Sequence, residues 1–361
     1  MHGQMVVQIN KIFNKNNFCL FIYKNLISMS IFGFGILINR GISTSPTSLG
    51  IYFDQLAKSL PFFNSSPFPH RILLPLISSI TGIEVQILNI LLLYIFTYNV
   101  LSYLVKDQGI ELSIFVSLIF VTTMIFQFHI IYGGYPDILS LLFYLLCIKN
   151  IKNNNFFVYF FLSLLVREAA LIVAPILFLI RQYENKHDRT FIKMSFVILI
   201  YLPIYFLLQK EASFSNSNGW EFYILPLLND PLFWFKKSIG YYWLGFFTSM
   251  KFAFLLLPLI LKSKRDYLLV FISFICVNIQ FIVSGGDNTR YWLIFFIPFI
   301  YILKNNLVKF KNYKIVLLLI LTLNIITPKY YVFTDANKGN MYVTPYGSKL
   351  HIFDYYSFFD N

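Results

Sequence analysis

The chain has 361 residues and a formal net charge of +13, and it is 57% hydrophobic but only 12% charged. Soluble domains carry about 25% charged residues, so this composition excludes a soluble globular domain and a disordered chain. Apolar runs recur along the sequence, which is typical of a polytopic membrane protein. The positive charge does not indicate a nucleic-acid partner, because Lys and Arg lie in short clusters between the apolar runs.

The first predicted membrane span covers 19–38, and a polar stretch rich in Pro and Ser follows at 39–70. The segment 71–80 is expected to form a short helix at the membrane surface. Several later spans are shorter than the roughly 20 residues that a complete crossing needs. These later spans are predicted at 85–104, 112–128, 137–148, 193–208, 240–261, 267–284, 291–303 and 314–328.

The apolar run 156–180 is interrupted by Arg167 and Glu168. It reads either as one tilted span or as two short passes, 156–166 and 168–180. Lys and Arg are retained on the cytoplasmic side of a membrane, and the two-pass interpretation puts 17 of the 29 Lys and Arg but only 5 of the 16 Asp and Glu there. The cytoplasmic segments are then 1–25, 105–111, 149–155, 181–193, 262–266 and 304–314.

This layout predicts an all-α, polytopic transmembrane helix bundle of about 9–11 spans. One membrane domain is expected at 1–328, with its first outer loop at 39–84, and a short extracytoplasmic tail follows at 329–361. The charge distribution predicts a cytoplasmic N-terminus. We expect the chain to lie in the cytoplasmic (inner) membrane. The active face is then extracytoplasmic, because the polar clusters fall in the outer turns.

Charged residues at membrane depth are costly, so those that persist there are functional candidates. A carboxylate in such a place can accept a proton from a hydroxyl nucleophile or bind a metal ion, and an arginine can hold a phosphate. The structural alternatives are helix caps, interface anchors and local ion pairs. The candidates are Asp54, His70 and Arg71 in the first outer loop, Asp137 after a Gly-Gly turn, Arg167 and Glu168, and Asp287 and Arg290 in GGDNTR.

Taken in order, these motifs resemble those of the GT-C superfamily of integral-membrane glycosyltransferases, in particular bacterial relatives of the mannosyl- and arabinosyltransferase type. The matching segments are YFDQLAKSL, HRILLPL, GYPD, LVREAALIVAP and GGDNTRYWLIFFIP. The resemblance covers roughly residues 20–305, and it depends on the order and spacing of short motifs. The first loop carries one Asp where many members carry paired acids.

The resemblance implies an enzyme that transfers a sugar from a polyprenyl-phosphate-linked donor to a glycan or lipid acceptor of the cell envelope. It implies that Asp54 is the catalytic carboxylate, as a general base or as the ligand of a divalent metal. It also implies that Arg71 and Arg290 hold the donor phosphate. The expected substrate-binding residues are His70, Arg71, Asp137, Arg167, Glu168, Asp287 and Arg290. The expected partners are this donor, the acceptor and membrane lipids.

Three other functions stay open at this point. A polysaccharide or O-antigen polymerase also uses arginines on the outer face, although a larger late loop than 209–239 is usual. A transporter or flippase for lipid-linked sugars favours charged residues near mid-membrane and an internal repeat, whereas this chain has one mid-span cation, Lys251, and no evident repeat. A non-catalytic assembly subunit is the third alternative.

Overall fold

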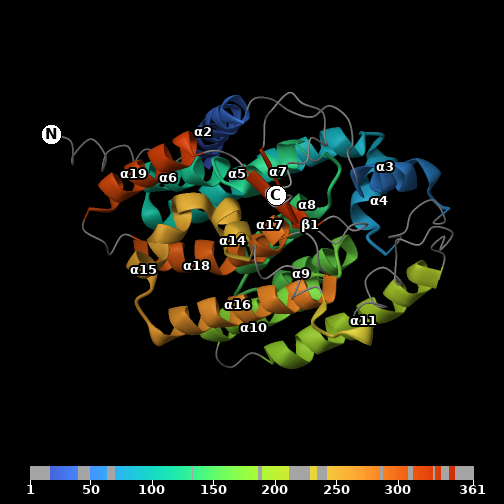
Figure 1. Ribbon diagram of the computed structural model, residues 1–361. Coiled ribbons are helices and arrows are strands. Elements are labelled where there is room, and N and C mark those ends of the chain that lie inside the picture. The colour runs from blue at the N-terminus through green and yellow to red at the C-terminus, as the bar shows by residue number, and fades with distance from the viewer. Residues whose placement is uncertain are drawn as a thin grey trace, which may run out of the picture.

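A computed structural model describes residues 17–39, 49–62, 70–131, 133–185, 189–210, 228–233, 242–284, 288–307, 312–327, 330–334 and 341–345. Within these ranges the chain forms a bundle of α-helices, so the expected helical architecture is confirmed (Figure 1). The expected tail contributes a feature that the sequence did not indicate. It contains two antiparallel strands, β1 (Tyr330–Thr334) and β2 (Met341–Pro345), with Tyr330 opposite Pro345.

The helices follow the expected apolar segments closely. The first half of the chain forms α2 (Asn17–Ile38), α3 (Leu49–Ser59), α4 (Leu73–Thr81), α5 (Val85–Gln108), α6 (Ile110–Val121), α7 (Met124–Ile131), α8 (Asp137–Lys149), α9 (Asn155–Val166) and α10 (Ala170–Glu184). The second half forms α11 (Thr190–Lys210), α14 (Tyr242–Met250), the 3-10 helix η2 (Lys251–Leu256), α15 (Leu257–Ile260), α16 (Lys264–Ser284), α17 (Asn288–Tyr291), the 3-10 helix η3 (Trp292–Phe295), α18 (Phe296–Asn306) and α19 (Tyr313–Ile326).

Five helical segments in the described ranges are long and apolar enough to cross a membrane, and the pair α6 and α7, which is bent by 57°, makes a sixth if it counts as one span. The five segments are Cys19–Ile38, Val85–Gln108, Thr190–Lys210, Trp243–Ile260 and Lys264–Ile282. Shorter apolar helices cover Asn155–Val166, Trp292–Asn306 and Tyr313–Ile326. These features make the chain a multi-pass membrane protein, and the full count of about 9–11 crossings stays a prediction.

The centre of the bundle is α18, whose residues from Phe296 to Leu303 are all buried. A helix that is apolar on every side belongs in the interior. It lies between α5 and α8 on one side and α16 on the other (Figure 1).

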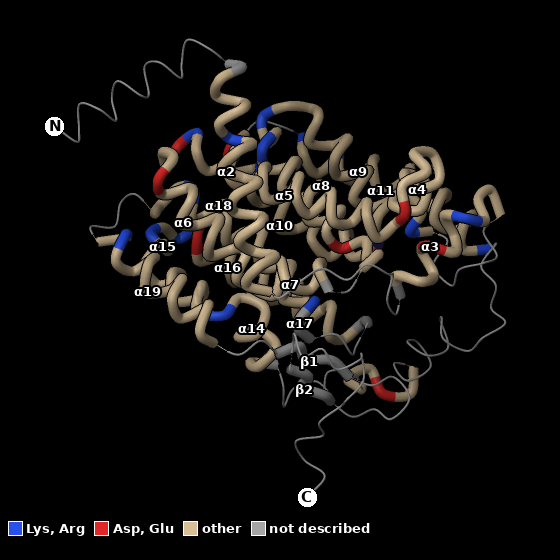
Figure 2. Tube along the Cα trace, turned by 90° about the horizontal axis from the view of Figure 1, so that it is seen from above, with Lys and Arg blue, Asp and Glu red and all other residues tan. Residues whose placement is uncertain are grey.

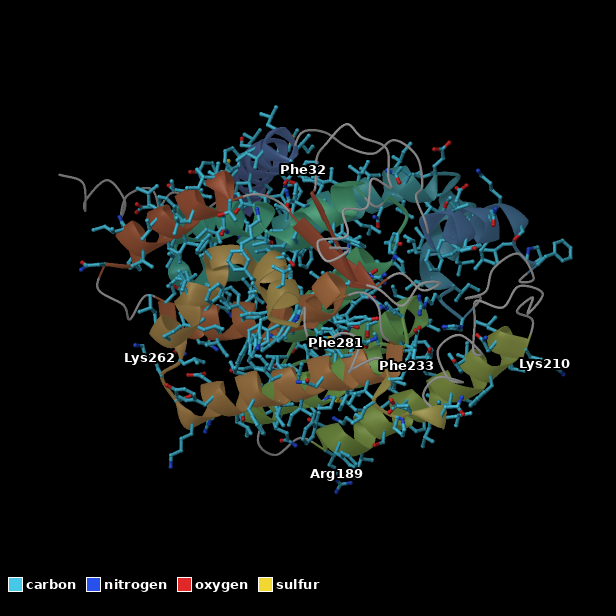
Figure 3. The ribbon with its side chains drawn as sticks, in the orientation of Figure 1. Phe32, Arg189, Lys210, Phe233, Lys262 and Phe281 are labelled. Atoms are coloured by element: carbon cyan, nitrogen blue, oxygen red, sulfur yellow. The ribbon has the colours of Figure 1, made fainter. Side chains whose placement is uncertain are left out.

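The peripheral helices α2 and α11 bury only 17% and 11% of their most apolar windows, which leaves broad apolar faces for lipid. Phe281 points into this interior, whereas Arg189, Lys210 and Lys262 project from its periphery (Figure 3).

The apolar run 156–180 forms two helices that reverse direction at the expected interruption. α9 ends at Val166 and α10 begins at Ala170. The far end of α10 returns to the start of α9, because Arg181 Nη1 donates to the carbonyl oxygens of Ile151, at 2.7 Å, and Asn153, at 2.9 Å. The run 156–180 is therefore a helical hairpin and not one continuous helix, and the two short membrane passes stay a prediction.

The predicted cytoplasmic segments meet at one end of the bundle. Lys304 Nζ lies 2.7 Å from the carboxylate of Asp107, and Lys314 Nζ lies 2.8 Å from that of Glu111. Between the two ends, most of the length of the helices carries no charged residue (Figure 2). The charged residues that remain inside the bundle therefore stand out, and the largest group lies at the opposite end.

Lys251, expected in mid-span, lies at a break where α14 passes into η2. Its backbone has a φ of +46°, and its side chain is only 2% exposed. Nζ donates to the carbonyl oxygen of Asn324 in α19, at 3.1 Å. The Asn324 side chain in turn accepts from the Phe252 N–H and donates to Thr122 Oγ1, between α6 and α7. A polar network thus joins three helical segments inside the bundle.

Candidate functional site

Charged side chains from four separate segments meet at the end of the bundle opposite the predicted cytoplasmic segments. Asp137 opens α8, Arg167 and Glu168 lie in the break between α9 and α10, Arg71 precedes α4, and Arg290 lies in α17. Asp137, Arg71 and Arg290 are buried, with exposed fractions of 4%, 9% and 6%. We call these five residues the arginine cluster. Residues from four of the five sequence motifs thus meet in one site.

Asp137 bridges two arginines. The Arg167 guanidinium donates from Nη1 to Asp137 Oδ1, and Arg290 Nη2 lies 3.1 Å from Asp137 Oδ2. Asp137 is also the first residue of α8, where the positive end of the helix dipole favours a carboxylate. The same residue therefore starts a helix and joins α8 to the α9–α10 break and to α17.

Glu168 holds Arg71 through two contacts. Arg71 Nε donates to Oε2 at 2.9 Å, and Arg71 Nη2 donates to Oε1. His70 Nε2 lies 3.1 Å from the same Oε2. Glu168 therefore contacts two side chains, those of Arg71 and His70, that are neighbours in the sequence.

Two aromatic rings cover Arg290. The guanidinium carbon lies 4.8 Å from the Tyr135 ring centroid and 5.6 Å from that of Phe128, within the range of cation–π attraction. His129, which follows Phe128, is fully buried, and its Nδ1 lies 2.5 Å from the Ile125 carbonyl oxygen. The walls of the site around Arg290 are thus aromatic and enclosed.

A cavity of about 30 Å³ opens beside Asp137, which is room for roughly two water molecules. In the part of the chain that is described, Ser140 Oγ and Arg167 Nε are buried without a hydrogen-bond partner. Such groups need a polar partner, because a buried unsatisfied donor or acceptor is costly. The cavity is lined by Asp137, Ser140, Leu141, Tyr144, Arg167, Ala169, Gln280, Arg290, Tyr291, Leu293 and Ile294.

Asp54 lies on α3, outside the described ion pairs of the arginine cluster. Its partner is Lys58, one helical turn further on, with Nζ 2.6 Å from Oδ2. The same helix begins against the turn that precedes Asp137. A Cβ on Gly50 would lie 2.0 Å from the carbonyl oxygen of Gly133, so only glycine permits this approach. Asp54 thus lies one turn along α3 from a direct contact with the Asp137 turn.

One predicted site residue, Asp287, lies outside the described residues. Three other residues near the site were not predicted from the sequence. The sequence reasoning missed Gln209, whose Oε1 lies 2.6 Å from His70 Nδ1, and also Tyr144 and Gln280 in the cavity wall. Polar glutamines inside otherwise apolar helices were the available signal for Gln209 and Gln280.

The described residues do not form a metal site. No group of three or more His, Cys, Asp and Glu side chains within these ranges can hold an ion. The carboxylates of Asp54, Asp137 and Glu168 are each engaged by a lysine or by arginines. This donor set does not fit the divalent metal that the family resemblance implied.

No protein-family model, curated protein or solved structure matches this chain. The chemistry of the site therefore has to be argued from its own residues. Within the described residues, the guanidinium groups of Arg71, Arg167 and Arg290 gather at this end of the bundle. Arginine is the side chain best shaped to bind a phosphate through two N–H groups, so the site suits an anion.

Proposed function

We propose that the chain is an integral-membrane glycosyltransferase of the GT-C type. It transfers a sugar from a polyprenyl-phosphate-linked donor to a glycan or lipid acceptor at the extracytoplasmic face. The observation that carries this proposal is the convergence of Arg71, Arg167 and Arg290, from separate segments of the chain, at one end of the bundle. Guanidinium groups suit the phosphate of the donor, which Arg71 and Arg290 bind.

The depth of the cluster supports a donor carried by a lipid. α8 begins at the cluster and has 13 residues, and α9 ends at the cluster and has 12 residues. They are therefore about 20 and 18 Å long, whereas the hydrocarbon core of a bilayer is about 30 Å thick. Since the other ends of both helices lie at the opposite side of the bundle, we infer that the arginines lie below the outer surface of the membrane. A phosphate on a polyprenyl chain reaches this level together with its lipid tail.

Asp54 is the proposed acceptor of the proton in the transfer. The acceptor hydroxyl oxygen forms a bond to the anomeric carbon, the bond from that carbon to the phosphate oxygen breaks, and the polyprenyl phosphate leaves. The hydroxyl proton goes to Asp54. Among the described carboxylates at this end of the bundle, Asp54 has the ion-pair partner that is easiest to displace, because the Lys58 side chain is 71% exposed. Asp137 and Glu168 are held by arginines. No step runs through a metal ion.

Two alternatives use specific features of the same chain. A polysaccharide polymerase would bind its lipid-linked chains with the same arginines. A transporter for lipid-linked sugars is favoured by the 57° bend between α6 and α7 and by buried Lys251 at the neighbouring break, since broken helices near mid-membrane form transport sites. The described contacts of Lys251, however, join it to the end of α19, which also accounts for its burial.

The test is mass spectrometry of membrane glycolipids and surface glycans from three strains. They are a strain that lacks the gene, the same strain rescued by the wild-type chain, and one rescued by Asp54→Asn at matched membrane levels. The proposal predicts that the deletion loses one sugar and that Asp54→Asn does not restore it. A transporter or polymerase role instead predicts loss of whole glycan units. Full rescue by Asp54→Asn would show that Asp54 is not the catalytic carboxylate.

A further inference from the structure

The ion pair between Arg71 and Glu168 occupies the N–H groups that an anionic ligand needs. Nε and Nη2 of Arg71 lie on one edge of the guanidinium, and both donate to the Glu168 carboxylate. Arginine binds phosphate oxygens through the same edge-on, two-point arrangement. An internal carboxylate thus lies where the proposed function, on which this inference rests, puts the donor phosphate.

Glu168 is held less firmly than the other carboxylate of the cluster. Its side chain is 34% exposed, compared with 6% for Asp137. Asp137 is the first residue of a helix and lies between two arginines. Glu168 lies in the non-helical break between α9 and α10, directly after Arg167, whose backbone is extended with a φ of −161° and a ψ of 131°. Glu168 therefore has the greater freedom to change its side-chain position.

A second partner is in place for Glu168 when it leaves Arg71. His70 Nε2 lies 3.1 Å from Oε2, and the other ring nitrogen of His70 lies 2.6 Å from Gln209 Oε1 on α11. The imidazole is thereby fixed beside the ion pair. A carboxylate that turns away from Arg71 keeps the contact with His70 and moves toward the exposed side of the site. Withdrawal of Glu168 thus does not leave a buried charge without a partner.

We propose that Glu168 is a built-in counter-anion, which occupies Arg71 in the ligand-free protein and is displaced by the phosphate of the incoming lipid. Glu168 thereby neutralises Arg71 while the site is empty. Two negative groups compete for Arg71, so removal of the Glu168 charge strengthens phosphate binding. A residue that only orients Arg71 has the opposite effect, because its loss weakens binding. The sign of the change in affinity distinguishes these two roles.

The experiment measures binding of farnesyl phosphate to the purified full-length chain in detergent, with farnesol as the phosphate-free comparison. Glu168→Gln keeps the shape of the side chain and removes its charge. We expect about tenfold tighter binding of farnesyl phosphate, since a like charge next to a bound anion costs affinity of this order or more, and no change for farnesol. Glu184→Gln is the matched control, because Glu184 is 31% exposed and lies at the opposite end, next to Lys152. It should leave both affinities unchanged.

Unchanged or weaker binding of farnesyl phosphate to Glu168→Gln would overturn the counter-anion role. If this variant does not fold, Glu168→Asp keeps the charge but shortens its reach to Arg71, and it should also bind more tightly than the wild-type chain. The two possible failures give different results. If neither the wild-type chain nor the variants prefer farnesyl phosphate to farnesol, the proposed phosphate site is wrong. If the wild-type chain shows this preference but the variants do not bind more tightly, only the role of Glu168 is wrong.

Discussion

Arg290 and Asp137 are 153 residues apart in the sequence, yet Arg290 Nη2 lies 3.1 Å from Asp137 Oδ2 in the interior of the bundle. Their side chains are 5% and 6% exposed. This contact joins α17, in the second half of the chain, to the first residue of α8. It makes the site a junction of the two halves of the chain, so the charges that are proposed to bind the ligand also hold the fold together.

Replacement of Asp137 by Asn should destabilise the protein strongly. Arg167 and Arg290 would lose their shared carboxylate, and breaking a buried pair from one side costs about 3–5 kcal/mol. The measurement is the thermal unfolding midpoint in detergent. Glu111→Gln is the control, because its ion pair with Lys314 is more than half exposed at both partners and should contribute little. An equal midpoint for Asp137→Asn and the wild-type chain would show that the ion pairs of Asp137 with Arg167 and Arg290 do not stabilise the fold.

A methyl group on Gly50 should disturb the contact between α3 and the Asp137 turn. Its Cβ would lie 2.0 Å from the carbonyl oxygen of Gly133, so the two segments have to separate. We expect Gly50→Ala to lower the unfolding midpoint and to reduce transfer activity through displacement of Asp54. Gly33→Ala is the matched control, since a Cβ on Gly33 meets nothing within 4 Å in α2. There alanine should stabilise the helix by up to about 1 kcal/mol. Equal behaviour of the two variants would refute the contact.

Substitution of Asn324 by Leu should cost about 1–3 kcal/mol, since it removes the partner of the buried Phe252 N–H and of Thr122 Oγ1. Chemical or thermal unfolding in detergent measures this loss. Thr322→Val, on an exposed position of the same helix, should have little effect. If Asn324→Leu unfolds like the wild-type chain but abolishes activity, the network around Lys251 serves function rather than stability.

Much of the helical layout could be predicted from the sequence, because apolar length and the positions of Lys and Arg depend on local composition. The change in chain direction at Arg167 and Glu168 was predicted from the distribution of Lys and Arg along the sequence. The bend between α6 and α7 and the break at Lys251 could not be predicted in this way. They depend on tertiary partners such as Asn324, and the apolar pattern continues through both breaks.

The members of the site were visible in the sequence, but their pairing was not. Asp287 and Arg290 are three residues apart and suggested a local pair, but Asp287 lies outside the described residues. The contact of Arg290 with Asp137, 153 residues away, had no signal in the sequence. Arg167 and Glu168 are neighbours that turn to different partners, as expected for adjacent residues that do not share a face. Pairing over such separations is set by how the helices pack, and one sequence does not contain that information.

The most direct test of the central claim is the amount of polyprenyl-phosphate-linked sugar in the membranes of strains that carry arginine variants. Arg71→Gln and Arg290→Gln are compared with Lys304→Gln, which lies at the opposite end beside Asp107, at equal membrane levels of protein. If the arginines bind the donor, one polyprenyl-phosphate-linked sugar accumulates in both arginine variants while an envelope glycan or lipid lacks that sugar, and Lys304→Gln behaves like the wild-type chain. Normal donor levels and complete glycans in both well-folded arginine variants would contradict the proposed function.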